Sequence, residues 1–255
     1  PMRFTHVFLT RPQPQADELA ALLTPLGLKT VVQPAFSYTA VDAEQQQAAE
    51  TRALAAAGPA DLVLFTSPRA VAFGLPQISA AVLSRCRVGA IGPASAAALA
   101  ASGIRASLTP RDGFTSEALL ETLEAGDPGQ HPGQRRAFII AAPGGRKKLS
   151  AGLAAMGWDT RTLLVYRPEA APLDKTVLAE LQNSDGLLSI WTSANVMKAL
   201  SQRLPPATWF RICQGDWLVI SERLKRLARA YGPPAIHLAN GPGNRDILSA
   251  VRAML

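Results

Sequence analysis

The 255-residue sequence contains few of the residues that carry metal, redox or covalent chemistry. It has two cysteines, Cys86 and Cys213, which form no CxxC pair, and three scattered histidines. A zinc site needs a cluster of such ligands, so no metal is expected. The sequence also lacks the G-x-x-x-x-G-K-[ST], G-x-G-x-x-G and G-x-S-x-G motifs, which argues against a nucleotide site and a serine nucleophile. We therefore expect neither a cofactor nor covalent catalysis.

Long hydrophobic runs are missing as well. No stretch approaches the roughly 18 consecutive apolar residues of a membrane span. The first residues become polar too early for a signal peptide. These observations predict a cytoplasmic protein with no membrane contact.

Aromatic residues make up only 6% of the chain, whereas its formal net charge is +7. A positive charge favours an anionic partner, and nucleic acid is the first candidate. The basic residues are scattered, however, and no aromatic residues lie among them as a platform for stacking bases. We therefore expect no nucleic acid, and a small anionic ligand is the better hypothesis.

Short apolar runs alternate with amphipathic segments along the whole chain. This pattern predicts an α/β protein with largely parallel sheets. Helices are predicted over 15–26, ending at Gly27, over 45–57, and after most of the strands. The predicted strands cover 7–10, 29–33, 61–65, 88–91, 106–108, 137–141, 160–165, 186–191, 217–220 and 236–238.

An internal repeat divides these elements into two sets. The segment 65–71 resembles 191–197. Further on, Ile91 and Ile220 each lead through a helix to a glycine, Gly103 or Gly232, 12 residues along the chain. A shorter unit also occurs twice, over 8–27 and 138–157. The order along the chain is short, long, short, long, which predicts two similar domains.

The repeat allows two divisions of the chain. Simple halves would be 1–130 and 131–255. Phe36 and Tyr166, however, fall at matching points in extended segments that hold an aromatic residue near proline, and these segments are typical of linkers. We prefer a nested arrangement, in which the chain begins one domain, builds all of the second, and returns.

Two Thr-Ser pairs each follow a predicted buried strand and open a helix. They are Thr66-Ser67, before Pro68, and Thr192-Ser193. Serine is a preferred N-cap, so both pairs are expected at the carboxyl edge of a sheet, where open α/β folds bind ligands. Free N–H groups at a helix start suit carboxylate or phosphate. Ordinary helix capping is the alternative interpretation.

Other polar and basic residues are predicted at the same edges. Gly92 and Ser95 follow the strand 88–91, and Ser221 takes the corresponding place in the second copy. Arg11, Arg69 and Arg146 lie near strand ends or helix starts, where an arginine can hold a carboxylate through two hydrogen bonds. Each of these arginines could equally be a solvated residue at a helix start.

The order and spacing of these motifs over nearly the whole chain resemble the uroporphyrinogen-III synthase family. The segments that carry the resemblance are 9–12, 65–71, 92–99, 166–168 and 191–195. It implies a monomer with two open, parallel-sheet, flavodoxin- or Rossmann-like domains, the second inserted into the first through a two-stranded β linker. Mapped here, the first domain is 1–36 plus 169–255, the second is 40–164, and the linkers cover about 36–40 and 164–169.

The resemblance also implies an activity and a set of site residues. The substrate would be hydroxymethylbilane, closed with loss of water and inversion of its last ring, without a cofactor; a transient contact with hydroxymethylbilane synthase is a further implication. Tyr166 would help the hydroxyl leave, while the residues named above bind carboxylates. Ser221-Glu222-Arg223 departs from the family pattern, so the contacts of that loop are in doubt. A non-enzymatic binder of a polyanion is the main rival, and a sugar or nucleotide transferase is the third choice.

Overall fold

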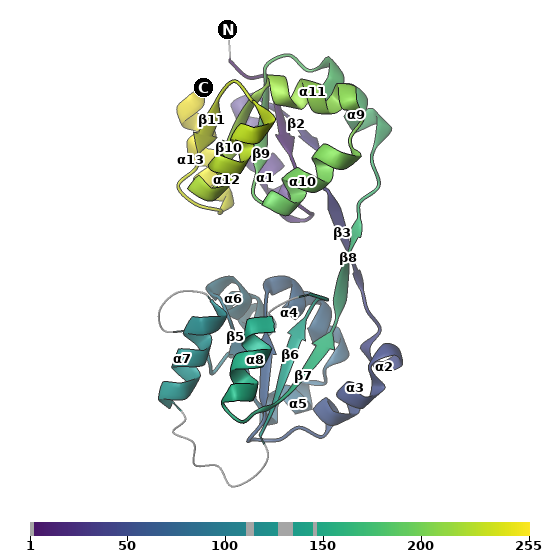
Figure 1. Ribbon diagram of the computed structural model, residues 1–255, viewed down its shortest axis with the longest axis vertical. Coiled ribbons are helices and arrows are strands. Elements are labelled where there is room, and N and C mark those ends of the chain that lie inside the picture. Colours follow the sequence, from purple (N-terminus) through teal and green to yellow (C-terminus); the bar gives the residue numbers. More distant parts are fainter. Residues whose placement is uncertain (1–2, 111–114, 127–134, 145–146) are drawn as a thin grey trace. The chain divides into compact units, whose positions relative to one another are not determined.

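The computed structural model describes residues 3–110, 115–126, 135–144 and 147–255 (Figure 1). The chain divides into two compact units. Unit 1 comprises Pro1–Ser37 and Glu169–Leu255, and unit 2 comprises Tyr38–Pro168. Each unit is an α/β structure around a parallel sheet, and unit 2 is inserted into unit 1. The predicted fold class is therefore confirmed.

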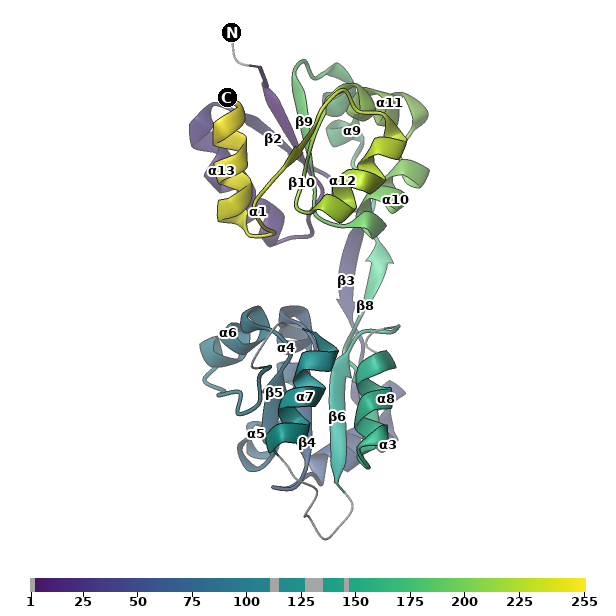
Figure 2. The same cartoon turned by 60° about the vertical axis from the view of Figure 1, so that its left-hand side comes forward.

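Unit 1 is built on a five-stranded sheet in the order β11-β10-β9-β1-β2. Its strands are mostly apolar, and those in the middle of the sheet are buried, because helices cover both faces of the sheet (Figure 2). The strands are β1 (His6–Leu9), β2 (Lys29–Val32), β9 (Leu187–Trp191), β10 (Asp216–Val219) and β11 (Ile236–Leu238). One face carries α1 (Gln15–Leu23) and α13 (Asn244–Met254). The other carries α9 (Lys175–Asn183), α10 (Ala194–Arg203), α11 (Pro206–Gln214) and α12 (Glu222–Ala228).

Unit 2 has a four-stranded sheet within the described ranges, in the order β5-β4-β6-β7. The strands are β4 (Leu62–Phe65), β5 (Arg87–Ala90), β6 (Arg136–Ala141) and β7 (Asp159–Leu164). Helices α7 (Ser116–Gly126) and α8 (Lys147–Ala155) pack on one face. The other face is covered by α2 (Ala43–Gln46), α3 (Ala48–Ala55), α4 (Pro68–Gly74), α5 (Ala80–Arg85) and α6 (Pro93–Ala101).

The two sheets repeat one topology. The β1-α1-β2 segment corresponds to β6-α8-β7, and β9-α10 corresponds to β4-α4. In each sheet the chain adds strands in one direction from β1 or β6 and in the other direction from β9 or β4. The boundary between these two series is a topological switch point, the usual place for a ligand in an open parallel sheet.

Two local predictions were wrong. The helix predicted over 45–57 is broken at Gln47, whose backbone is not helical. The Gln47 side chain instead pairs with the backbone of Leu164, with Nε2 2.7 Å from the carbonyl oxygen and Oε1 accepting from the N–H at 2.8 Å. The predicted strand 106–108 is reduced to a single bridge between Leu108 and Gly89 of β5.

Two short strands connect the units. β3 (Phe36–Ala40) and β8 (Tyr166–Ala170) form a two-stranded sheet. On the unit 1 side, the guanidinium of Arg203 donates to the carbonyl oxygens of Ala35, at 2.8 Å, and Ala171, at 2.5 Å. On the unit 2 side, Gln77 Nε2 donates to the carbonyl oxygen of Val165, just before β8, at 3.4 Å, and its Oε1 accepts from the N–H of Ala43 at 2.9 Å. Side chains therefore fasten the linker to both units.

Gly186, just before β9, gives a test of backbone packing in unit 1. Its φ is 61°, and a Cβ there would lie 2.9 Å from the carbonyl oxygen of Arg3. We expect Gly186→Ala to lower the free energy of unfolding by about 2 kcal/mol, because it adds a clash to a left-handed backbone. Gly232→Ala is the control, since its φ is 72° but no atom lies within 4 Å. Urea unfolding followed by tryptophan fluorescence measures both, and equal losses would show that the clash contributes nothing.

Candidate functional site

The carboxyl edge of the unit 2 sheet is organised around Thr66 and Ser67. The buried Thr66 hydroxyl donates to the carbonyl oxygen of Ile140 at 2.9 Å and so joins β4 to β6 at the switch point. Ser67 is the N-cap of α4, and its Oγ accepts from the N–H of Ala70 at 3.0 Å. The predicted cap at Ser67 is confirmed.

Tyr166 lies beside this cap. Its phenol oxygen is 3.3 Å from Ser67 Oγ, and its side chain is largely buried. The ring stacks on Phe73, with centroids 5.4 Å apart, and meets the edge of Tyr38 at 5.9 Å. These contacts hold the Tyr166 hydroxyl at the start of α4.

Arg69 places a positive charge in the same cluster. Its guanidinium lies 3.5 Å from the centroid of the Tyr38 ring and 5.8 Å from that of Tyr166. A guanidinium over an aromatic face is held electrostatically, and its edge remains free to bind an anion. Tyr38 was missed by the sequence analysis, which treated it as part of a linker.

The other predicted residues of unit 2 lie around the next helix. Gly92 is the N-cap of α6, and Ser95 is buried in the first turn of that helix. Gly92 thus borders the carboxyl end of β5, next to β4 in the sheet. Arg146 lies outside the described residues.

In unit 1, Arg11 is fixed after the end of β1. Its Nη1 donates to Asn244 Oδ1 at 2.5 Å, and Asn244 Nδ2 lies 3.3 Å from Glu18 Oε2. Burial lowers the pKa of Arg11, while the charge of Glu18 acts in the opposite direction. Arginine side chains nevertheless stay cationic in folded proteins.

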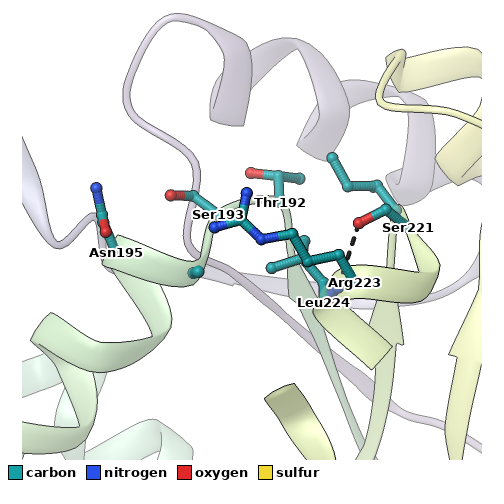
Figure 3. A pocket seen from close by; sticks show the side chains of 8 residues that line it. Thr192, Ser193, Asn195, Ser221, Arg223 and Leu224 are labelled. Atoms are coloured by element: carbon teal, nitrogen blue, oxygen red, sulfur yellow. Dashed lines mark hydrogen bonds between the residues drawn. The ribbon is translucent and has the colours of Figure 1, made fainter. Parts of the chain in front are cut away.

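A pocket of about 310 Å³ opens between the loops that follow β9 and β10 (Figure 3). It brings together three predicted residues, Thr192, Ser193 and Ser221. The complete lining is Thr192, Ser193, Ala194, Asn195, Ile220, Ser221, Arg223 and Leu224. Among the described residues, the lining is rich in hydroxyl groups and includes one basic and no acidic side chain.

The predicted role of Ser193 was wrong in one respect. It occupies the N-cap position of α10, yet its hydroxyl makes no capping hydrogen bond. Ser221 does cap its helix, with Oγ accepting from the N–H of Leu224 at 3.3 Å. The residue pattern is similar in the two loops and both serines line the pocket, but only Ser221 caps its helix.

Asn195 and Arg223 are pocket residues that the sequence analysis missed. Figure 3 shows the Arg223 side chain extending from α12 across the pocket toward Ser193 and Thr192. The available signal was the departure from the family pattern at Ser221-Glu222-Arg223. This departure raised doubt about the contacts of the loop, and the structure shows that it places the Arg223 side chain in the pocket.

The two cysteine thiols are not activated as nucleophiles. Burial raises the pKa of Cys213 to about 11 and also raises the pKa of Cys86, so both thiols are poor nucleophiles at neutral pH.

Within the described ranges, no group of three or more His, Cys, Asp or Glu is placed to hold a metal ion. No helix in that part of the chain is long and apolar enough to cross a membrane.

The fold and these sites define a class of protein. It has two like α/β units, each with hydroxyl groups and an arginine at the carboxyl edge of its sheet, an arrangement suited to a small molecule with several negative charges.

Comparison with known proteins identifies the family. The family described as Uroporphyrinogen-III synthase HemD matches residues 17–249. The uroporphyrinogen-III synthases of Escherichia coli (strain K12) and Salmonella typhimurium (strain LT2) are each 30% identical to the chain, over 96% of the chain and 99% of either relative. The chain belongs to the uroporphyrinogen-III synthase family.

Solved structures agree at the level of the fold. A mutant uroporphyrinogen III synthase from the extremely thermophilic bacterium Thermus thermophilus has a TM-score of 0.60 at 19% identity, and the match covers 98% of both chains. The uroporphyrinogen-III synthetase from Helicobacter pylori 26695 also has a TM-score of 0.60, at 15% identity, with coverage of 99% of this chain and 100% of that one.

Proposed function

We propose that the chain is an enzyme that converts hydroxymethylbilane into uroporphyrinogen III. Its membership of the family over residues 17–249 carries this proposal. The reaction removes the terminal hydroxyl of the linear tetrapyrrole as water, which leaves an azafulvene. Attack at the substituted carbon of the last ring, rearrangement through a spiro intermediate and closure then invert that ring.

Tyr166 is the proposed catalytic residue. Because Ser67 Oγ already accepts from the N–H of Ala70, its own proton is free to be donated to the Tyr166 oxygen, 3.3 Å away. The Tyr166 O–H is then free to donate to the departing hydroxyl of the substrate. Hydrogen bonding to a leaving group as its charge develops lowers the barrier.

The remaining predicted residues are proposed to bind the acetate and propionate groups. Hydroxyl groups and arginines suit carboxylates, and the net charge of +7 favours a polyanionic substrate. Because the substrate supplies the reacting groups, we propose that the enzyme works as a monomer without a cofactor, by holding the flexible chain in a reactive shape. The proposed residues are Arg11, Thr66, Ser67, Arg69, Gly92, Ser95, Arg146, Thr192, Ser193 and Ser221. Because Thr66 and Ser67 already donate their hydroxyl protons within unit 2, their part is proposed to be played by the N–H groups at the start of α4 beside them.

An isomer assay tests the function without relying on any assigned residue. Purified protein given hydroxymethylbilane should yield the type III isomer, whereas spontaneous closure without the protein gives the symmetric type I isomer. The products are oxidised to porphyrins and separated by chromatography. Formation of type I alone would remove the proposed activity and leave a non-enzymatic binder.

A further inference from the structure

Arg223 is the basic residue of the unit 1 pocket, and none of the described residues pairs with it. It is exposed on the first turn of α12, and its side chain crosses the pocket toward Ser193 (Figure 3). Other arginines of unit 1 are engaged: Arg3 pairs with Asp216, and Arg203 binds two carbonyl oxygens. A guanidinium that faces a polar pocket without an anionic partner is available for an anionic ligand.

Ser193 supplies a second uncommitted group in the same pocket. Among the described N-cap serines, Ser67, Ser79 and Ser221 each accept a backbone N–H from their own helix, but Ser193 does not. Its hydroxyl therefore retains its donor and both of its lone pairs. Together with Arg223 it offers hydrogen-bond donors from two neighbouring loops.

The duplication of the fold adds an independent observation. By the repeat, Asn195 occupies the place of Arg69 in unit 2, and Arg223 occupies the place of Ala94. Each unit thus presents an arginine at the carboxyl edge of its sheet, but from a different loop: after β4 in unit 2, and after β10 in unit 1. The positive charge is retained although its position in the repeat has changed.

We propose that Arg223, together with Ser193, binds a carboxylate arm of the linear tetrapyrrole in the unit 1 pocket. The planar guanidinium pairs with both carboxylate oxygens, and Ser193 donates a further hydrogen bond. Arg223 is thereby a substrate-binding residue that acts through its side chain. This inference rests on the proposed function, because the linear tetrapyrrole is the substrate proposed there.

The first test compares Arg223→Ala with Arg226→Ala. Arg226 is also exposed on α12 but does not line the pocket, so the two variants lose the same charge. We expect Arg223→Ala to raise the KM for hydroxymethylbilane by about tenfold with little change in kcat, and Arg226→Ala to leave both unchanged. Arg223→Lys should recover only part of the loss, because an ammonium cannot pair with both carboxylate oxygens.

The second test moves the positive charge within the unit 1 pocket, from Arg223 to Asn195, the position that is equivalent to Arg69 of unit 2. In the Arg223→Ala background, Asn195→Arg should bring the raised KM most of the way back to the wild-type value, because Asn195 also lines the pocket. Binding of uroporphyrin III, the oxidised form of the proposed product, should weaken and recover in parallel. Equal effects of Arg223→Ala and Arg226→Ala, no effect of Arg223→Ala, or no rescue by Asn195→Arg would each overturn the inference.

The two levels of the proposal fail differently. A wild-type protein that makes no type III isomer contradicts the proposed function itself. A wild type that makes the type III isomer, with an unchanged KM in Arg223→Ala, contradicts only the role of Arg223.

Discussion

Replacing Asp61 by asparagine is expected to lower the free energy of unfolding of unit 2 by about 3 kcal/mol, because it breaks a buried ion pair and leaves the other charge uncompensated. Asp61 is 4% exposed, and its Oδ2 lies 2.6 Å from Nη2 of Arg136. Its carboxylate also accepts from the backbone N–H groups of Gly58, at 2.8 Å, and Arg136, at 3.1 Å. The group joins the start of β4 to the start of β6.

The control is an exposed ion pair in the same unit. Lys148 Nζ lies 3.1 Å from Glu117 Oε1, but the two side chains are 84% and 53% exposed. Glu117→Gln should therefore cause no measurable loss. Urea unfolding combined with hydrogen exchange at the amides of β4 and β6 measures the stability of unit 2 separately from that of unit 1. Equal stability of the Asp61 and Glu117 variants would contradict the prediction.

The Asp61 carboxylate should also make the free energy of unfolding of unit 2 depend on pH. Burial by itself raises the pKa of Asp61, but the hydrogen bonds from Arg136 and Gly58 outweigh it, and the net pKa is lowered. The contribution of Asp61 is therefore complete above its unfolded pKa of about 4 and is lost as the pH falls through the lower folded pKa. Unfolding midpoints measured across this range should decline less steeply in Asp61→Asn than in the wild type.

Replacing Tyr166 by phenylalanine is expected to lower kcat about a hundredfold, the effect of losing a positioned hydrogen-bond donor to the leaving group. The fold should remain intact, because the ring keeps its contacts with Phe73 and Tyr38. Single-turnover kinetics with hydroxymethylbilane, together with circular dichroism, separate these effects. KM should change little if the hydroxyl acts mainly in the transition state.

Tyr38→Phe is the matched control for Tyr166→Phe. Tyr38 belongs to the same aromatic cluster and lies under Arg69, but its hydroxyl forms no hydrogen bond with the described residues. We expect it to retain nearly all of the wild-type turnover. Full activity in Tyr166→Phe, or an equal loss in Tyr38→Phe, would remove the special role assigned to the Tyr166 hydroxyl.

The arrangement of strands and helices was largely predictable, because it depends on periodic apolar residues and on a repeat. The equivalence of Phe36 and Tyr166 indicated the two linker strands, and the Thr-Ser pairs indicated the carboxyl edges. The break at Gln47 was not predictable, because a glutamine inside an apparently continuous helix reveals nothing of a backbone partner as distant as Leu164.

The positions of the side chains in the site were harder to predict from the sequence. Ser67 and Ser193 occur in similar local sequences, yet one caps its helix and the other does not, since the rotamer depends on the surrounding loops. Tyr38 and Tyr166 come together only when the linker strands pair. Arg223 was visible as a departure from a pattern, but only the folded loop shows that it enters a pocket.

The nested connection between the units also sets an order of events during synthesis of the chain. Strand β1 lies between β2 and β9 in its sheet, and all of unit 2 is made after β2 and before β9. Unit 2 is a continuous segment, so it can fold while β1 still lacks its neighbour β9 and α1 still lacks its neighbour α13. We expect the inserted unit to fold first on the ribosome, and the enclosing unit to close only when β9 emerges.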